Sequence, residues 1–271
     1  MKPLPRMTIV TPSYNQAQYI EQTIRSVLDQ NYPDLEYWVI DGGSTDGTVD
    51  VLRRYDDRIN WMSERDRGQA HAINKGLERA TGEVVAYLNS DDVYEPGALT
   101  TVGHFFARHP QAAWVTGKCR IIDQNGQEVR KAITFYKNMW LRLGSYTLLL
   151  ILDYISQPAT FWRRQVLERV GVFDEALYYT MDYDYSLRVG RHYRLQVIDE
   201  YVASFRVHPH SKGGSGARKH FQADLETARQ YTTSPLLLGL HRLHNTMVVA
   251  IYARLVGTRV AEVPAPETQI G

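Results

Sequence analysis

The sequence predicts an α/β fold in which helices flank a mainly parallel β-sheet, with a helical extension at the C-terminal end. Three observations support this class. Between residues 7 and 88, short apolar runs typical of buried strands alternate with segments whose apolar residues recur at helical spacing. This alternation favours parallel strands joined by right-handed crossovers. Several apolar runs end in polar clusters, and in parallel sheets ligands bind beyond the carboxyl ends of the strands.

The first two strands and the helix between them follow from residue type and spacing. Residues 7–11 (MTIVT) are a short apolar run, and residues 36–41 (EYWVID) read as a second strand after the turn signal YPDL. Between these strands, apolar residues recur every three or four positions, at Ile20, Ile24, Val27 and Leu28. This spacing predicts one helix with its apolar side on the sheet.

The next elements continue the alternation. Asp46 precedes a segment with helical spacing, and its carboxylate either caps that helix or contacts a ligand. Residues 59–62 (INWM) predict a short third strand. Residues 68–80 predict a helix, and residues 84–88 (VVAYL) predict a further strand.

The second half of the chain is less regular. The apolar stretch at residues 139–155 predicts either a helix or a flap over a cleft, and Asn125-Gly126 is a strong hairpin turn signal. The other expected elements are a strand end at 157–164, helices at 164–170 and from Asp182 onward, a strand at 201–208 and a glycine-rich loop at 208–216.

Domain organisation is simple, because no repeat, low-complexity segment or linker interrupts the chain. We expect one domain over residues 1–232 and an extension over residues 233–271. The extension is apolar around much of its circumference, so it either packs on the domain or contacts a membrane surface or another subunit. The last nine residues, VPAPETQIG, are typical of a disordered tail.

Composition narrows the function classes. The formal net charge of +1 gives no general electrostatic attraction to nucleic acid. The single cysteine, Cys119, excludes an internal disulfide and fits a reducing compartment. We expect a cytosolic protein, because the start MKPLPRMTIV has no apolar run of signal-peptide length and no stretch reaches the roughly 18 apolar residues of a membrane span.

Three polar clusters should meet at one edge of the sheet. Residues 11–15 and 41–46 each begin with the last residue of a predicted strand, and residues 89–92 directly follow one. The carboxyl ends of parallel strands share an edge. The third cluster contains the adjacent carboxylates Asp91 and Asp92, which repel each other unless a cation or hydrogen-bond donors compensate.

A second interpretation of this cluster is a solvated turn. Asp92 or Glu95 would then cap a helix that has Pro96 at its first position.

Four stretches of the sequence point to a family: TIVTPSYNQAQYIEQTIRSVLDQNYPDLEYWVIDGGSTDGT, DRGQAHAINKGLERATGEVVAYLNSDD, QPATFWRR and MDYDYSLR. They run from Thr8 to about Arg188, around two thirds of the chain. In this order and spacing they resemble the family 2 glycosyltransferases, enzymes with the Rossmann-like GT-A fold. The resemblance implies a nucleotide-sugar donor, a divalent metal (Mn²⁺ or Mg²⁺) on its diphosphate, and transfer to an acceptor hydroxyl with inversion.

Two other enzyme classes fit the sequence less well. A sugar-nucleotide pyrophosphorylase would have a glycine-rich phosphate loop directly after the first strand, where this chain has TPSYNQAQ. A dinucleotide-dependent oxidoreductase would have a Gly-x-Gly-x-x-Gly turn there, which is also missing.

The resemblance places Asn89-Ser90-Asp91 at the family's Asp-x-Asp motif. It implies that Asp91 binds the metal, with Asp92 as a second ligand or an orienting group. A hard cation held by one or two carboxylates and by phosphate oxygens neutralises the leaving diphosphate. His208 lies where some relatives have a histidine that touches metal or diphosphate, or it is structural. Asn89 adds no charge, but its amide can hydrogen-bond a ribose hydroxyl.

The donor-binding residues implied by the resemblance belong mainly to the first two clusters. They are Thr11, Pro12, Tyr14 and Asp41 for base and ribose, with Asp66, Lys75, Asn89 and Ser90 on the donor side. A carboxylate only accepts hydrogen bonds, so Asp41 suits the N3–H of uracil or thymine or the edge of guanine, and we expect a UDP-, GDP- or dTDP-sugar. Many relatives have two adjacent Asp residues where this chain has Asp41-Gly42, and Asp41 is alternatively structural.

The resemblance makes Asp182 the catalytic base. Inverting transfer needs one carboxylate to take the proton of the acceptor hydroxyl as that oxygen attacks the anomeric carbon. The family's Glu-Asp stretch with a following Arg corresponds here to Met181-Asp182 and Arg188. Asp184 is the second candidate, or a solvated acid in the first helical turn. Arg188 is expected to pair with a carboxylate.

The expected function is therefore metal-dependent sugar transfer to a glycan or lipid-linked acceptor in cell-envelope or exopolysaccharide synthesis. It would take place in the cytoplasm or peripherally at the inner face of the plasma membrane. Residues 1–117 would bind the nucleotide sugar, and residues 118–232 would supply acceptor and catalytic groups. The alternative, kept open by Asn89 and Met181, is a degenerate domain that binds nucleotide sugars or partners without turnover.

Overall fold

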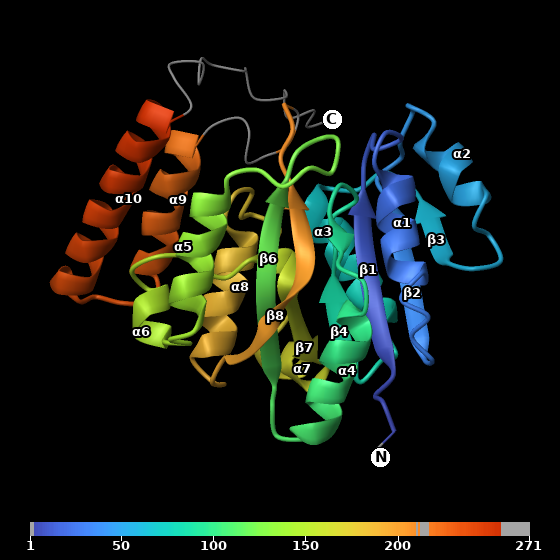
Figure 1. The fold of residues 1–271 in the computed structure, drawn as a ribbon, viewed down its shortest axis with the longest axis horizontal. Coiled ribbons are helices and arrows are strands. Elements are labelled where there is room, and N and C mark those ends of the chain that lie inside the picture. The colour runs from blue at the N-terminus through green and yellow to red at the C-terminus, as the bar shows by residue number, and fades with distance from the viewer. Residues whose placement is uncertain (1–2, 210, 212–216, 256–271) are drawn as a thin grey trace.

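The computed structural model describes residues 3–209, 211 and 217–255, and Figure 1 shows a central sheet between helices. Within these residues the sheet has eight strands in the order β3-β2-β1-β4-β7-β6-β8-β5. The strands are β1 (Met7–Ser13), β2 (Leu35–Asp41), β3 (Asn60–Ser63), β4 (Val84–Tyr87), β5 (Val93–Tyr94), β6 (Trp114–Ile122), β7 (Thr160–Arg163) and β8 (Gln196–Arg206). The helices are α1 (Ile20–Leu28), α2 (Thr48–Arg53), α3 (Gln69–Arg79), α4 (Ala98–Arg108), α5 (Lys131–Leu141), α6 (Tyr146–Leu149), the 3₁₀ helix η1 (Gln157–Ala159), α7 (Gln165–Val170), α8 (Met181–Gly190), α9 (Ala217–Arg229) and α10 (Pro235–Leu255).

The predicted α/β class with a mostly parallel sheet is confirmed. Strand β1 pairs in parallel with β2 and β4, β2 with β3, and β6 with β8. Strand β7 is antiparallel to β4 and β6, and the short β5 is antiparallel to β8. Because β1 lies between β2 and β4, the carboxyl ends of three parallel strands meet at one edge of the sheet.

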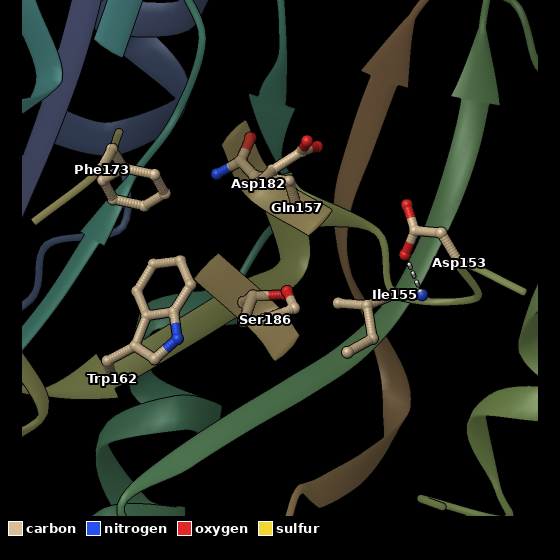
Figure 2. Close-up of a pocket in the computed structure, with 8 residues that line it drawn as sticks. Asp153, Ile155, Gln157, Trp162, Phe173, Asp182 and Ser186 are labelled. Atoms are coloured by element: carbon tan, nitrogen blue, oxygen red, sulfur yellow. Dashed lines mark hydrogen bonds between the residues drawn. The ribbon is translucent and has the colours of Figure 1, made fainter. Parts of the chain in front are cut away.

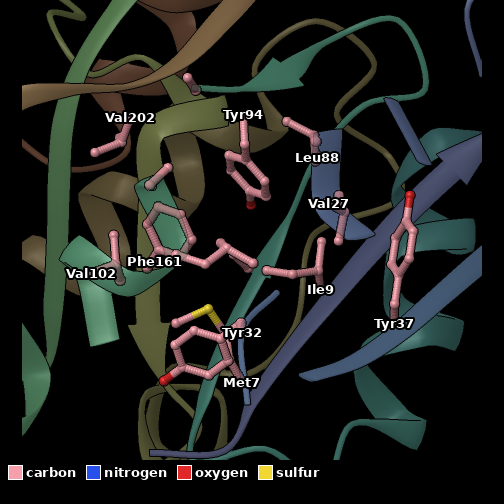
Figure 3. Close-up of a cluster of buried hydrophobic side chains, with 14 of the residues drawn as sticks. Met7, Ile9, Val27, Tyr32, Tyr37, Leu88, Tyr94, Val102, Phe161 and Val202 are labelled. Atoms are coloured by element: carbon pink, nitrogen blue, oxygen red, sulfur yellow. The ribbon is translucent and has the colours of Figure 1, made fainter. Parts of the chain in front are cut away.

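Side-chain alternation along the strands creates two apolar layers. Met7 and Ile9 of β1 belong to one cluster and Val10 to the other, because successive side chains of a strand point to opposite faces of the sheet. Val27 of α1 and Val102 of α4 cover the first layer, which Figure 3 shows. Helices α3 and α8 contribute to the second layer.

Most predicted elements form close to the expected positions. The helix predicted over residues 68–80 is α3, and the helix predicted from Asp182 onward is α8. The Asn125-Gly126 turn is a tight hairpin, in which the Gly126 N–H donates to the carbonyl oxygen of Asp123 at 3.0 Å and Gly126 has φ +80°. The strand predicted at 201–208 begins earlier, at Gln196.

Of the alternatives that the sequence leaves open, two are wrong. Residues 139–155 do not form one helix, since α5 ends at Leu141, Gly144 takes φ +53°, and α6 is a separate short helix. The helix after the Asp91-Asp92 cluster does not begin at Pro96. Strand β5 intervenes, and α4 begins only after Gly97, whose φ of +78° favours glycine.

The C-terminal helix α10 packs on the domain. His241 is buried, with its Nδ1 2.9 Å from the carbonyl oxygen of Leu150, and His244 Nε2 lies 3.0 Å from the Tyr136 hydroxyl. The tail at residues 263–271 and most of the loop at 208–216 lie outside the described residues. Among the described helices, none combines the length and the apolar character that a membrane span requires.

Candidate active site

The three polar clusters lie side by side at the edge formed by β2, β1 and β4. Strand register pairs Ser13 with Asp41 and Val10 with Tyr87, which aligns the ends of these strands. The Gly42 N–H donates to the carbonyl oxygen of Ser13 at 2.8 Å, so the first two clusters are held together by the backbone. We call this region the donor edge.

Asp91 and His208 form the polar centre of the donor edge. His208 Nε2 lies 3.0 Å from Asp91 Oδ2, although the two residues follow different strands. The His208 side chain is 3% exposed and that of Asp91 is 16% exposed. The carboxylate therefore reaches solvent while the imidazole lies buried behind it, with the Tyr19 ring 4.7 Å from its centroid.

Arg206 holds the turn that carries the two acids. Its Nε donates to the carbonyl oxygen of Asp91 at 2.7 Å, and its backbone N–H donates to Asp92 Oδ1 at 2.8 Å. Asp92 is fully buried, and its other oxygen accepts a hydrogen bond from Asn89 Nδ2 at 3.1 Å. Burial raises the pKa of Asp92 well above its ordinary value, and the neighbouring charge of Asp91 adds to the rise. Of the two roles predicted for Asp92, this geometry favours the orienting one.

Asn89 is the junction of a hydrogen-bond network. Its Oδ1 accepts from Gln69 Nε2 at 2.6 Å, and its Nδ2 donates to Asp92 and, at 3.5 Å, to Gln157 Oε1. Gln157 Nε2 in turn donates to the carbonyl oxygen of Tyr87 at 2.7 Å. A contact between the Asn89 amide and a ribose hydroxyl stays a prediction. Such a contact would replace one of the hydrogen bonds that Asn89 makes with Gln69, Asp92 or Gln157.

The Asp41 carboxylate accepts hydrogen bonds from the loop that directly follows it. It is fully buried, and its Oδ2 accepts hydrogen bonds from the N–H groups of Gly43 (3.1 Å) and Ser44 (2.9 Å) and from Ser63 Oγ (2.6 Å). These bonds support the structural alternative for Asp41, and its contact with a base stays a prediction.

Gly42 leaves room for the Asp66 carboxylate at the donor edge. A Cβ on Gly42 would lie 2.6 Å from Asp66 Oδ2, so a side chain at this position would displace the carboxylate. Asp66 Oδ1 accepts from the Gly68 N–H at 2.8 Å, which fixes its direction. Lys75 pairs with Glu64 at 2.7 Å, so its ammonium already has a counter-charge.

The remaining predicted donor contacts differ in exposure. Tyr14 is 62% exposed at the end of β1 and can reach a ligand. Thr11 is fully buried with its hydroxyl 3.0 Å from that of Tyr37, so this side chain faces the core. Pro12 and Ser90 are also buried.

The Asp46 side chain supports the start of α2. Its Oδ1 accepts from the N–H of Thr48, the first residue of the helix, at 3.0 Å, and its Oδ2 accepts from the Ala17 N–H at 2.9 Å. The capping interpretation therefore agrees with the structure, although Gly47 is the residue that directly precedes the helix.

Asp182 lies in a small pocket that continues the donor edge (Figure 2). The pocket is lined by Asp153, Ile155, Gln157, Thr160, Trp162, Phe173, Asp182 and Ser186. Gln157 both lines this pocket and hydrogen-bonds Asn89, so the candidate base and the donor edge belong to one continuous site.

Ionisable groups gather around this pocket. Burial raises the pKa of Asp153 to about 6, with Lys137 opposing the rise and Asp182 adding to it. Burial also raises the pKa of Asp224 well above its ordinary value and lowers that of His220. His220 Nε2 lies 3.7 Å from Asp224 Oδ2 on α9. The base candidate thus has two further carboxyl groups in its electrostatic surroundings.

Asp184 is not the solvated acid that one of the sequence interpretations describes. It is buried, accepts a hydrogen bond from the Tyr231 hydroxyl, and pairs with Arg188 Nε at 2.9 Å. The pairing predicted for Arg188 is confirmed. Its guanidinium also donates to the carbonyl oxygen of Val170 at 2.7 Å, so Asp184 and Arg188 tie α8 to α7.

Sequence reasoning missed Arg206, Asp153 and Asp224. Arg206 had a signal, because a cation inside the apolar strand YVASFRV is costly unless it is hydrogen-bonded. Asp153 had one too, as the lone acid in the apolar run LLLILDYI. Asp224 sits on an ordinary amphipathic helix, and nothing in its neighbourhood in the sequence distinguishes it.

A divalent cation at the donor edge would need further coordinating atoms from a bound phosphate compound and from water. Among the described residues, no group of three or more His, Cys, Asp or Glu side chains could hold a metal ion. Mg²⁺ at nucleotide sites commonly keeps one or two protein carboxylates and takes its remaining ligands from phosphate and water. The Asp91 oxygen and the His208 nitrogen, 3.0 Å apart, are such a partial set.

Comparison with known proteins decides the family. The family model described as Glycosyl transferase family 2 matches residues 8–171, more than half of the 271 residues. The chain belongs to glycosyl transferase family 2. The match covers the donor edge of this glycosyltransferase through Asp91 and ends before Asp182.

Relatives of this glycosyltransferase agree with that assignment. A Bacillus subtilis glycosyltransferase named for teichuronic acid biosynthesis, TuaG, is 41% identical over 133 residues, which are 48% of this chain and 52% of the relative. The chain thus spans about half the length of that relative.

Two solved structures share the fold. The mannosyltransferase PcManGT of Pyrobaculum calidifontis, in complex with GDP-Man and Mn²⁺, has a TM-score of 0.68 at 22% identity, covering 96% of this chain and 78% of that one. S. aureus TarS 1-349 in complex with UDP-GlcNAc has a TM-score of 0.66 at 17% identity, covering 94% and 77%.

Proposed function

We propose that this glycosyltransferase moves a sugar from a nucleotide-diphosphate sugar to an acceptor hydroxyl with inversion. The observation that carries the proposal is the continuity of the site, in which Gln157 joins the Asn89 network at the donor edge to the pocket of Asp182. An inverting transfer needs the donor phosphates and the base on opposite sides of one anomeric carbon. One site with Asp91 at the edge and Asp182 in the adjoining pocket supports that arrangement.

Each residue has a defined part in the proposed reaction. Asp182 accepts the proton of the acceptor hydroxyl while that oxygen forms the new bond to the anomeric carbon, and the bond to the diphosphate breaks. Asp91 and His208 would hold a divalent cation, which when bound neutralises charge on the leaving diphosphate. Arg206 and Asp92 keep the Asp91 turn in place.

The donor is proposed to be a UDP-, GDP- or dTDP-sugar bound with its phosphates near Asp91. Tyr14, Asp66 and Asn89 are the predicted contacts that lie at the donor edge and are not buried. The complexes of TarS with UDP-GlcNAc and of PcManGT with GDP-Man and Mn²⁺ support a nucleotide-sugar donor with a metal.

The acceptor is proposed to be a glycan or lipid-linked saccharide of a cell-surface polysaccharide. This proposal is supported by the name of the Bacillus relative, which refers to teichuronic acid biosynthesis. The competing proposal is a degenerate domain that binds nucleotide sugars without turnover, and it is based on Asn89 and Met181 in place of the family's carboxylates.

Release of nucleoside diphosphate from UDP-, GDP- and dTDP-sugars in the presence of Mn²⁺ tests the proposal, with calorimetry of donor binding beside it. We expect release with one of these donors, and loss of release but retained donor binding in Asp182→Asn. Asp57→Asn, an exposed acid before β3, is the matched control and should release at the unmodified rate. Binding without release by the unmodified chain would favour the degenerate domain. Full release by Asp182→Asn would remove Asp182 as the base.

A further inference from the structure

Exposed apolar side chains concentrate on two helices of this protein. Of the ten large hydrophobic residues that are exposed in the described part of the chain, seven lie on α10 or on α5 and the turn after it. They are between 40% and 72% exposed. These seven residues, here named the apolar face, are Phe135, Met139, Leu143, Leu236, Leu240, Leu243 and Met247.

The two sets of residues belong to one surface. On α10 they recur at intervals of four, three and four positions, and on α5 at intervals of four, which places each set along one side of its helix. Tyr136 and His244 join the helices through a contact of 3.0 Å between hydroxyl and Nε2, with their rings stacked at 6.2 Å. Phe135 and Leu243 are the sequence neighbours of that pair. Figure 1 shows α5 and α10 on the side of the sheet that carries β6 and β8, away from α1 and α2.

This surface is not needed to hold the helices on the domain. The opposite side of α10 supplies that contact through the buried His241, and α5 supplies it through Thr134 and Leu141. Single exposed hydrophobic residues are ordinary, but a cluster of this kind marks an interaction site in a soluble protein.

The charged residues on and beside α5 and α10 indicate which kind of partner the apolar face would contact. Neither α5 nor α10 contains Asp or Glu, whereas Arg242 is exposed on α10. Lys131 and Arg142 are exposed at the two ends of α5, where they lie 4.0 Å from Glu128 and 3.5 Å from Asp199. In a twofold dimer the same patch meets itself, so the Arg242 cation would be brought against the cations of the second copy. An anionic bilayer instead offers hydrocarbon to the leucines and phosphate to the cations.

We propose that the apolar face docks this protein on the surface of a bilayer that contains anionic lipid, with α5 and α10 in the interface. The sequence left a membrane, a subunit or simple packing open for the C-terminal helix. The structure adds α5 to this surface, and the absence of Asp and Glu from both helices favours the bilayer. This docking is independent of the proposed transfer reaction, because it involves no residue of the donor edge or of the Asp182 pocket.

Co-sedimentation of the full chain with lipid vesicles tests the docking. We expect binding to vesicles of phosphatidylcholine with phosphatidylglycerol, weaker binding to phosphatidylcholine alone, and loss of the anionic preference at high salt. The double variant Leu240→Ser, Leu243→Ser should bind more than about tenfold more weakly, because it removes two side chains that would enter the bilayer. Both positions are exposed, so the variant should fold. Val172→Ser, an exposed apolar residue outside the face, is the matched control and should bind as the unmodified chain does.

Three results would overturn the proposal. They are no binding to anionic vesicles, equal binding by the double variant, or a concentration-dependent dimer in analytical ultracentrifugation that Leu243→Ser dissociates while vesicles do not bind. The last result would assign the face to a second copy. Donor calorimetry on the same preparation separates this question from the proposed function, because a failure of docking leaves donor binding unchanged.

Discussion

Nε2 of His208 lies 3.0 Å from Oδ2 of Asp91, and the imidazole is buried behind the partly exposed carboxylate. The two residues come from segments after β8 and β4, so their meeting depends on the strand order of the whole sheet. The geometry presents a carboxylate oxygen to anything that enters the donor edge, with an imidazole nitrogen directly behind it. It also allows the imidazole to orient the carboxylate by donating to it.

The first prediction concerns metal-dependent donor binding. Asp91→Asn should remove the Mn²⁺ dependence of donor binding, because an amide carries no charge for the cation. His208→Ala should weaken Mn²⁺-dependent binding about tenfold, since it removes either a ligand or the group that orients one. Calorimetric titration of the donor with and without Mn²⁺ measures both effects. His109→Ala, an exposed histidine after α4, should leave binding unchanged. Unaltered Mn²⁺ dependence in Asp91→Asn would remove the metal site from this edge.

The second prediction concerns the buried Arg206. Its guanidinium donates to carbonyl oxygens of Asp91 (2.7 Å) and Asp123 (3.0 Å) and to Gln22 Oε1 (2.9 Å), and the side chain is 1% exposed. Arg206→Met should destabilise the fold by about 3–5 kcal/mol, because it leaves these oxygens without donors inside the protein. Urea denaturation measures the change in the free energy of unfolding.

Arg58→Met is the control for Arg206, since Arg58 is exposed in the turn before β3 and should change stability by less than about 0.5 kcal/mol. Equal unfolding midpoints for the two variants would show that Arg206 is not the support of the Asp91 turn.

The donor edge could be predicted from the sequence because each of its parts is local. The alternation of strands and helices placed Asp41 at the end of its strand and Asp91 shortly after its own, and the rule for parallel sheets then placed both at one edge. The direction of each side chain could not be predicted in this way. The Thr11 side chain points into the core, where its hydroxyl contacts that of Tyr37. The Asp41 carboxylate accepts hydrogen bonds from Ser44 and Ser63.

The Asp182 pocket shows the other limit of sequence reasoning. Asp153 and Lys137 come from the segment between β6 and β7, where apolar residues gave no clear period and where a single helix, one of two predicted alternatives, does not form. The approach of Asp153 to Asp182 and to Lys137 depends on long-range packing. Nothing in the spacing of these residues along the chain encodes that approach.

The third prediction concerns the pH dependence of stability. The folded-state pKa of Asp153, about 6, lies above the ordinary value of 3.8. At this group the folded state therefore binds more protons than the unfolded state between these values, so the contribution of Asp153 to stability falls as pH rises from about 4 to about 6. Asp153→Asn removes the ionisation, so this variant should be more stable than the unmodified chain at pH 7 and nearly equal to it at pH 4. Urea denaturation at the two pH values gives the comparison.

Asp174→Asn, an exposed acid before α8, is the control for Asp153 and should show no such pH-dependent gain. A gain of the same size at pH 4 and pH 7 would mean that Asn packs better than Asp, whatever its charge.

The fourth prediction concerns the close approach of α3 to β1. A Cβ on Gly76 would lie 2.3 Å from Val10 Cγ1, a distance that no relaxed side chain tolerates. Gly76→Ala should therefore destabilise the fold by about 1–3 kcal/mol, although alanine is the better helix former. Val10→Ala removes the opposing methyl groups, so the double variant should lose less stability than the sum of the single variants, by roughly 0.5–3 kcal/mol of coupling.

Gly239 in α10 provides the matched control for Gly76, because a Cβ there would meet nothing within 4 Å. Gly239→Ala should stabilise the protein by about 0.4–1 kcal/mol, since it loses less backbone entropy on folding and creates no clash. Additive effects of Gly76→Ala and Val10→Ala in a double-mutant cycle would show that α3 can move away from β1. Gln69 at the start of α3 would then no longer be fixed against Asn89 by the packing of its helix.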